Sequence, residues 1–547
     1  MAAMSKLGIL VTAACLLIPV AANAQAQVGE LFATSDNCVA CHNGLVTADG
    51  HDVSIGHDWS GSMMANAARD PYWQAAVRRE MIDHPEAAAK IQDECSACHM
   101  PMARYTAKSA GQKGEVFAHL PVGPNPGERA ALAHEGVSCT MCHQVQPDGL
   151  GSEASFTAGF LVDETTSPGT RTIFGPFAVS EGRRHIMSSA ALFEPREGSH
   201  IQDSGLCGSC HTLYTHSRGE GGEVIGTLPE QMPYLEWEHS DYPGRESCQS
   251  CHMPTLEQQM PVSAVLGEPR DGFSRHVFRG GNFFMMRMLN RYRGELGVTA
   301  AARDLEDSAQ QTVEHLQRAS AEIAVTAQRQ PSGIVEAVVS VRNKAGHKLP
   351  SAYPSRRAWL HVVLRDADGK TVFDSGRLQP DGSIAGNDND ADPRRHEPHY
   401  AVIDDPSQVQ IYEGILAGPD GRITTGLLTA TRYTKDNRLL PEGFDKATAP
   451  DDIAVHGAGS SDASFAGGGD TVRYHIEPGD APGPYTVEAA LWYQPIAYRW
   501  AQNLAPYEAF ETRRFLRYYE SMSAESGLVL ARDRVLLPPR NRVRTFD

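Results

Sequence analysis

The cysteines fall into five copies of one short pattern, and this repetition constrains the chain more than any other feature. Of the 11 cysteines in 547 residues, ten form pairs separated by two residues, and a histidine directly follows each pair. The copies are Cys38-Val-Ala-Cys41-His42, Cys95-Ser-Ala-Cys98-His99, Cys139-Thr-Met-Cys142-His143, Cys207-Gly-Ser-Cys210-His211 and Cys248-Gln-Ser-Cys251-His252. Two thiols at this spacing reach the two vinyl groups of one porphyrin, and the adjoining imidazole then bonds the iron. The pattern therefore predicts five covalently attached c-type haems.

Three other uses of paired cysteines explain the pattern less well. A disulfide framework suits an exported chain with an even number of cysteines, but it gives no reason for a histidine after every pair. Zinc sites need sets of four ligands, and five Cys-Cys-His triplets do not divide into such sets. A thioredoxin-like redox motif would occur once rather than five times.

The first 24 residues have the form of an export signal. Lys6 supplies a positive charge, residues 7–20 an apolar stretch, and Ala22-Asn23-Ala24 a small-residue cleavage site before Gln25. The apolar stretch is too short for a comfortable membrane span, and we expect no span in the mature chain. We assign Cys15 to the core of the signal, with a lipid anchor as the alternative. The chain is therefore expected in the periplasm or outside the cell.

Acidic residues outnumber basic ones, which narrows the class of partner. The chain has 67 acidic and 49 basic residues, a net charge of −18. This balance argues against nucleic acid as a partner. We expect redox proteins as partners, and the sequence leaves the oligomeric state open.

The spacing of the motifs predicts that the haems share one core. The first cysteines stand at 38, 95, 139, 207 and 248, so that residues 25–297 hold one haem per roughly 55 residues. So short a segment cannot enclose each haem separately. The porphyrin rings must then form much of the apolar core and lie close together. Close packing is what an electron relay requires, because tunnelling falls steeply with distance.

Each iron has a sixth position, and 17 of the 22 histidines lie outside the motifs. The candidates for this position are His84, His119, His200, His276 and His347. The reserve candidates are His57, His134 and His185, together with Met63 and Met64, whose thioethers would raise the reduction potential. For the two methionines, a helix core is the competing interpretation. We expect His51, His216 and His239 to lie at the surface or to contact an iron ligand, rather than to bind iron themselves.

After the fifth motif the sequence changes from helical to strand periodicity. Helices are predicted over 281–293 and 299–320, and Asp368-Gly369 is a hairpin turn. The strand-like runs are 323–325, 334–341, 358–364, 371–373, 472–476 and 485–493. They predict an antiparallel sandwich, with mostly loop over 379–469 and a helix over 507–521.

We therefore expect an α-helical, loop-rich multihaem domain followed by a mainly-β domain of the immunoglobulin-like sandwich type. The expected boundaries are a signal peptide over 1–24, a pentahaem cytochrome c domain over 25–297, a connecting helix over 298–320, the β-sandwich over 321–500, and a C-terminal helix and tail over 501–547.

Two segments of the second half carry residues that bind metals in other proteins. Asp388, Asp390 and Asp392 alternate as in a calcium loop, but Pro393 and His399 occupy positions where an EF-hand needs Gly and Glu. A solvated acidic loop is the preferred interpretation, with calcium as the alternative. His347 follows a predicted strand in a Gly-His turn. Such a turn either directs the imidazole into the haem domain or lies at the surface.

Several stretches resemble bacterial multihaem c-type cytochromes, a group related in haem packing to nitrite reductases and hydroxylamine oxidoreductases. They are the five motifs, Cys95-Ser-Ala-Cys98-His99-Met100-Pro101, Glu135-Gly136-Val137-Ser138-Cys139 and Gly346-His347-Lys348-Leu349-Pro350. The likeness covers most of residues 30–350. It implies electron transfer in an extracytoplasmic respiratory chain, mainly bis-histidine ligation, and a haem-ligating role for His347.

The choice between electron relay and catalysis depends on whether one haem lacks a sixth protein ligand. No motif ends in lysine, so the Cys-x-x-Cys-Lys arrangement of catalytic nitrite-reductase haems is absent. The sequence favours relay. The alternative is an oxidoreductase that acts on a small nitrogen or sulfur compound at one five-coordinate haem.

Overall fold

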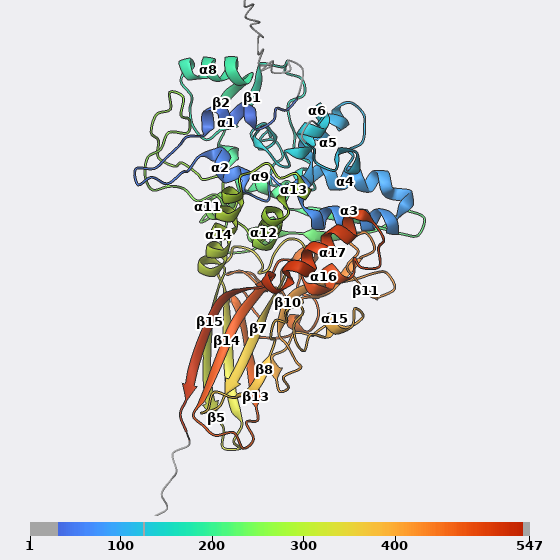
Figure 1. Cartoon of the computed structure of the whole chain (residues 1–547), viewed down its shortest axis with the longest axis vertical. Coiled ribbons are helices and arrows are strands. Elements are labelled where there is room, and N and C mark those ends of the chain that lie inside the picture. The colour runs from blue at the N-terminus through green and yellow to red at the C-terminus, as the bar shows by residue number, and fades with distance from the viewer. Residues whose placement is uncertain (1–30, 124–125, 540–547) are drawn as a thin grey trace, which may run out of the picture.

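The computed structural model describes residues 31–123 and 126–539. The predicted export signal, Cys15 included, lies outside these residues. A part made of short helices and loops stands above a part made of long strands (Figure 1). The helical part comes first in the chain and contains all five motifs, and we call it the motif half. The part with the long strands follows, and we call it the strand half. None of the described helices has both the length and the apolar composition that crossing a membrane requires.

The motif half consists of short helices and two small sheets. Its helices are α1 (Asp36–His42), α2 (Ile55–Ser60), α3 (Pro71–Asp83), α4 (Ala88–His99), α5 (Pro101–Ser109), α6 (Glu128–His134), α7 (Cys139–Cys142), α8 (Glu181–Ala191), α9 (Ser204–Gly208), α10 (Pro233–Glu238), α11 (Cys248–His252), α12 (Phe283–Arg291) and α13 (Arg293–Leu296). The strand β1 (Arg171–Gly175) runs parallel to β2 (Phe193–Glu197), and β3 (Leu213–Arg218) runs antiparallel to β4 (Val224–Gln231).

Local sequence explains where α3, the longest of these helices, begins and ends. The carboxylate of Asp70 accepts hydrogen bonds from the backbone N–H groups of Tyr72 and Trp73, which caps the helix, and Pro71 occupies its first turn. The helix ends at His84, directly before Pro85, because the residue before a proline disfavours helical backbone. Its buried face then packs against neighbours from both halves.

The strand half contains two sheets. The four-stranded sheet has the order β5 (Ala321–Arg329), β6 (Val335–Asn343), β13 (Gly469–Ile476) and β9 (Val402–Ile403). The seven-stranded sheet has the order β11 (Ile423–Thr424), β10 (Ile411–Ala417), β7 (Arg357–Arg365), β14 (Tyr485–Gln494) and β15 (Leu528–Leu537), and β8 (Thr371–Ser375) and β12 (Arg432–Asp436) also pair with β7 and β10. Alternate residues of β6, β13 and β14 are buried, as expected for sheets with one face toward a core.

The six predicted strands are all present, and five others of the strand half were not predicted: β9, β10, β11, β12 and β15. β10 lies within the segment expected to be mostly loop, and every one of its residues is buried because it pairs with strands on both sides. β15 lies in the segment expected to be a tail, where it pairs with β14 over most of its length. The chain therefore combines helices with substantial β-sheet, while the immunoglobulin-like class and the domain boundaries stay predictions.

The acidic run at 388–392 is not the solvated loop that we expected. Asp388–Ala391 forms the short helix α15, and the buried carboxylate of Asp390 pairs with the buried Arg357 guanidinium at 2.8 Å. Asp388 and Asp392 pair with neighbouring arginines. Arginine, rather than water alone, therefore neutralises these carboxylates.

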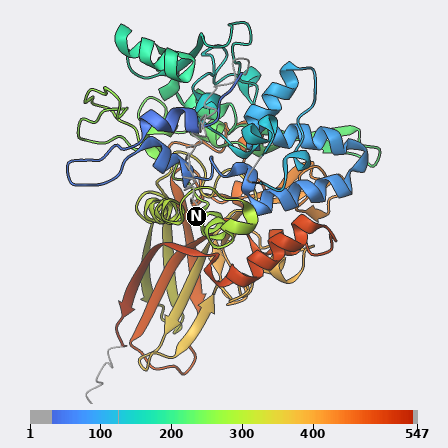
Figure 2. The same cartoon turned by 45° about the horizontal axis from the view of Figure 1, so that its top comes forward.

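The two halves interlock. Helix α17 (Phe510–Met522) lies directly beneath α3 in both views (Figures 1 and 2). Glu511 forms a two-pronged ion pair with Arg78, at 2.9 and 3.0 Å, and the Phe515 ring packs on Tyr72 with centroids 5.0 Å apart. Beyond β11, the backbone N–H of Leu427 donates to the buried carboxylate of Glu80 at 2.8 Å. The strand half thus completes the core of the motif half.

The contact between α17 and α3 predicts a loss of stability when Phe515 is truncated. Phe515 has no exposed surface, and Phe→Ala at such a site costs about 3–5 kcal/mol. The Phe515→Ala variant should therefore melt at a clearly lower temperature in a calorimetric scan. Phe510→Ala, in the same helix but 64% exposed, is the matched control and should change stability by less than about 0.5 kcal/mol. Equal melting temperatures for the two variants would contradict this account of the interface.

Candidate functional site

All five cysteine pairs begin in a helical turn. The motifs start within α1, α4, α7, α9 and α11. In a helix, residues three apart lie on one face, so both thiols of a pair point to the same side. All ten motif cysteines are described; each is free and half-buried. None of these ten thiols forms a disulfide in the described structure, and the two thiols of each pair lie on one side of a helical turn.

Four of the five motif histidines direct one ring nitrogen at a backbone carbonyl. The Nδ1···O pairs are His42 with Val262 at 2.6 Å, His99 with Ala67 at 3.0 Å, His143 with Phe174 at 2.5 Å, and His252 with Arg279 at 2.5 Å. A carbonyl oxygen can only accept, so Nδ1 carries the proton and Nε2 keeps its lone pair. Metal-ligating histidines in proteins are oriented by the same contact.

Burial keeps the imidazoles of His99 and His252 neutral. It lowers the pKa of His99 and of His252 to about 4, since the charged form would lose its hydration. Their Nε2 lone pairs are then available to iron at any ordinary pH.

Two candidates for the sixth position lie opposite a motif histidine. The rings of His143 and His276 have centroids 6.3 Å apart and planes 22° apart, and those of His252 and His347 are 6.2 Å and 5° apart. Two imidazoles that bond one metal from opposite sides, each at about 2.0 Å, hold their centroids roughly 6 Å apart. In both candidates Nδ1 faces a carbonyl oxygen, of Ser274 at 3.2 Å and of Lys348 at 2.8 Å, which again leaves Nε2 free.

The other three candidates are placed differently. The Nε2 atom of His84 lies 3.3 Å from the Thr429 hydroxyl, and His200 directs Nε2 at the Val145 carbonyl at 2.9 Å. His119 ends a short 3-10 turn, and its carbonyl accepts from His134 at 2.6 Å. Among the described residues, none of the three rings stands opposite a motif histidine at the separation seen for His276 and His347.

Two reserve candidates have other partners. His57 pairs with Asp304 of α14 (Ala302–Ala319) at 3.1 Å, and the side chain of His185 is 80% exposed. Neither arrangement is that of an iron ligand in this structure.

His315 was not among the sequence candidates, yet its ring centroid is 5.9 Å from that of His252, at 60° between planes. Burial lowers the pKa of His315 to about 3. It lies on α14, three residues after the buried Thr312 and directly before the buried Leu316. The helical periodicity of this segment could have revealed it, because the buried face of the helix includes this position.

The motifs touch one another through their cysteines. Three thiols lie next to a thiol of another motif, which is the leading cause of their raised pKa: Cys38 beside Cys139, Cys98 beside Cys210 and Cys207 beside Cys248. Cys142 also lies within electrostatic range of Cys210. The five motifs therefore form one connected array, with the third and fourth in its middle.

His211 differs from the other motif histidines. Desolvation by the surrounding residues, and then the nearby Arg356 cation, lower the pKa of its imidazole. Within the described chain, its ring has no hydrogen-bonding carbonyl of the kind found at the other four.

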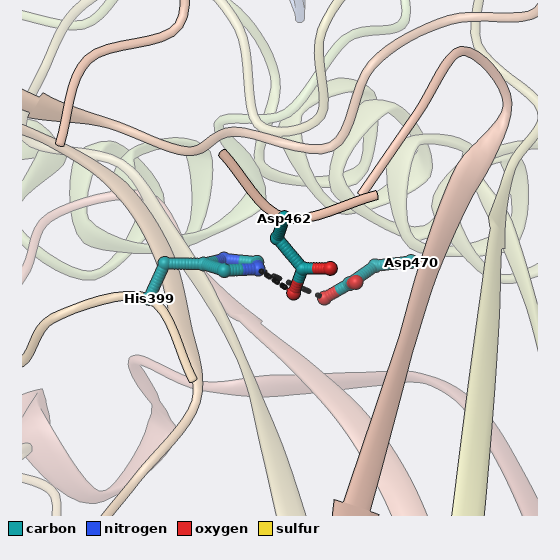
Figure 3. Close-up of side chains that lie close together, drawn as sticks. All are labelled: His399, Asp462 and Asp470. Atoms are coloured by element: carbon teal, nitrogen blue, oxygen red, sulfur yellow. Dashed lines mark hydrogen bonds and ion pairs between the residues drawn. The ribbon is translucent and has the colours of Figure 1, made fainter. Parts of the chain in front are cut away.

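A second cluster of possible metal ligands lies in the strand half: His399, Asp462 and Asp470, which we call the His399 cluster (Figure 3). The Nε2 atom of His399 is 3.2 Å from a carboxylate oxygen of Asp462 and 3.9 Å from one of Asp470. Burial raises the pKa of Asp470 to about 6 and lowers that of His399 to about 4. The donor set alone would suit a divalent cation.

The contacts around His399 argue against a metal at this cluster. Its Nδ1 accepts hydrogen bonds from the amide groups of Gln410 and Asn437, at 2.9 and 3.0 Å. Asn437 also donates to the Ile411 carbonyl and accepts from the Glu413 N–H, so its orientation is set by the backbone. Nε2 must then carry the proton, which it directs at the two carboxylates. A metal-ligating histidine has the opposite arrangement. The His399 cluster is therefore a buried hydrogen-bond network.

Comparisons with known proteins support the fold. No protein-family model matches the chain, and no curated protein sequence matches it. Among solved structures, the chain is similar to a penta-heme cytochrome c552 from Thermochromatium tepidum, with 15% identity and a TM-score of 0.52. The match covers 93% of this chain and 100% of that one, so the shared fold includes both halves.

The His399 cluster yields a prediction about metals. Because its proton positions are set for hydrogen bonding, adding zinc or calcium should leave the melting temperature unchanged, and so should a chelator. Calorimetric scans of the full chain and of Asp462→Asn test this. A zinc-dependent rise in melting temperature in the unmodified chain that disappears in Asp462→Asn would contradict the assignment.

Proposed function

We propose that this chain is an exported multihaem c-type cytochrome, in which five covalent haems transfer electrons between protein partners. The observation that carries the proposal is the placing of a second imidazole opposite a motif histidine, at His143 and at His252, at the separation that one iron imposes. The motif pattern supports the covalent attachment, and the likeness in fold to a solved penta-heme cytochrome agrees with it.

The residues present fit five such groups. The thiols of each motif attach one haem, and the iron is held by His42, His99, His143, His211 or His252. When bound, the iron supplies a one-electron oxidation and reduction. His276 and His347 are the proposed second ligands at the third and fifth motifs. His84, His119 and His200 remain candidates for the irons at the other three.

In this proposal the strand half supplies an iron ligand, His347, to the fifth motif. The turn that carries His347 is anchored by the fully buried Lys348, whose ammonium lies 2.7 Å from the Asp436 carboxylate. Asn343 donates to the carbonyl of His347 at 2.9 Å. These contacts orient the His347 imidazole toward His252.

Contacts between the motifs define the proposed path of the electrons. The first motif adjoins the third, the third adjoins the fourth, and the fourth adjoins both the second and the fifth. Electrons entering at the first motif would pass the third and fourth before they reach the second or fifth. A partner at each end suits such an array. The net charge of −18 favours partners with a basic surface.

A second candidate function is supported by the surroundings of His211. The Arg356 cation is near this imidazole, and Arg356 also interacts with the buried Tyr493, whose hydroxyl approaches the Gly281 backbone. A cation and a phenol beside a haem could bind a small anion. An oxidoreductase acting on a nitrogen or sulfur compound there would also fit the wider group related to nitrite reductases and hydroxylamine oxidoreductases.

Haem content tests the main proposal. The exported protein should contain five haems per chain by the pyridine haemochrome assay. Replacing both Cys38 and Cys41 by serine should reduce this to four, because both thioether bonds of one haem are lost. Cys15→Ser, which changes the one cysteine outside the motifs, is the control and should leave five. A value of five in the double variant would contradict covalent attachment at the first motif.

Carbon monoxide separates the two candidate functions. If every iron has two protein ligands, the visible spectrum of the reduced protein should not change when the gas is added. A shift in about one fifth of the haem would favour the oxidoreductase. Repeating the titration with Arg356→Ala shows whether that haem is the one at His211, since removal of the nearby cation should alter the shift.

A further inference from the structure

A third histidine approaches the pair formed by His252 and His347. The ring of His315 lies 5.9 Å from that of His252, against 6.2 Å for His347. Both separations are close to what two ligands on one iron require. One iron accepts only one further ligand besides His252, so the site contains one imidazole more than it can use at a time.

The nitrogens of His315 are not committed elsewhere. Within the part of the chain that the structure describes, the imidazole makes no hydrogen bond or ion pair, and its ring contact is with His252. Two other histidines of the second half do have such partners; His361 pairs with Asp374 at 2.9 Å, and His399 with Asp462 at 3.2 Å. A largely buried imidazole without a partner is costly unless another group satisfies it. An iron bond is one such group.

The two imidazoles come from different segments that contact each other. His347 belongs to a turn anchored in the strand half through Lys348 and Asp436. His315 belongs to α14, whose last turn is joined to the segment before His347: the backbone N–H of Lys344 donates to the Ser320 carbonyl at 2.9 Å, and its ammonium to the Arg318 carbonyl at 3.0 Å. These contacts keep both imidazoles close to His252.

We propose that His315 is an alternative axial ligand at the fifth motif, which takes the sixth position on the iron when His347 leaves it. The proposal rests on the proposed function, because it presupposes a haem at this motif. In the exchange the bond from iron to the His347 imidazole breaks and a bond from iron to the His315 imidazole forms. Both imidazoles are neutral, so no proton and no electron is transferred.

Spin state provides the test, because loss of a sixth protein ligand converts a low-spin iron to a high-spin one. In the electron paramagnetic resonance spectrum of the oxidised full-length protein, His347→Ala should show no more high-spin iron than the unmodified protein. One low-spin signal should change its g values, since the ring planes of His252 and His315 are tilted by 60° rather than 5°. His276→Ala is the matched control: His276 alone stands opposite His143 among the described residues, so one fifth of its iron should become high-spin.

A second variant identifies the replacement ligand. His315→Ala/His347→Ala should show one fifth more of the iron in the high-spin state than the unmodified protein. Such an increase already in His347→Ala would overturn the proposal, and so would a double variant with no increase. Pyridine haemochrome assays of all variants should give five haems per chain. Fewer than five in the unmodified protein would instead count against the proposed function, which keeps the two failures distinguishable.

Discussion

The hydrogen bond from a histidine Nδ1 to a backbone carbonyl is the interaction on which the candidate site depends. It decides which nitrogen keeps a lone pair and in which direction that lone pair points. His143 and His252 make this bond, and so do His276 and His347 opposite them. The acceptors of the two motif histidines lie far along the chain, Phe174 in β1 and Arg279 in a later loop, whereas His276 and His347 use carbonyls one or two residues away. The ligand geometry therefore relies on the whole fold, although the ligands themselves are encoded in five short motifs.

The same reasoning separates the two clusters of possible metal ligands. His399 lies beside two carboxylates, which a search by residue type alone would favour. Two amide groups donate to its Nδ1, and this places the proton on the nitrogen that faces the carboxylates. The partners of Nδ1 therefore distinguish the two kinds of site. Where they accept a hydrogen bond, Nε2 is free to bind a metal; where they donate one, Nε2 carries a proton and the site is a hydrogen-bond network.

The two halves interlock through apolar and polar contacts. The buried side chains of the motif half form a modest cluster around Ile91 and Met100, to which Leu428 of the strand half contributes. The buried carboxylate of Glu80, whose pKa burial raises to about 7, accepts from Leu427 and Leu428 across the boundary. Polar groups buried at such a boundary need hydrogen-bond partners, and this requirement fixes the position of one half relative to the other. A ligand offered from the strand half, such as His347, can then be positioned accurately.

Local patterns were enough to predict the attachment residues, the helices over 283–291 and 302–319, and six strands, because period and spacing are properties of neighbouring residues. They did not reveal β10, whose fully buried residues lack alternation, or β15, which exists only because β14 lies beside it. The same limit applies to ligands. Any of 17 histidines could meet an iron on sequence grounds, and only the folding of distant segments brings His276, His315 and His347 to motif histidines. Covalent attachment needs residues three apart in a helical turn, whereas a sixth ligand comes from any part of the chain that packing places opposite the motif.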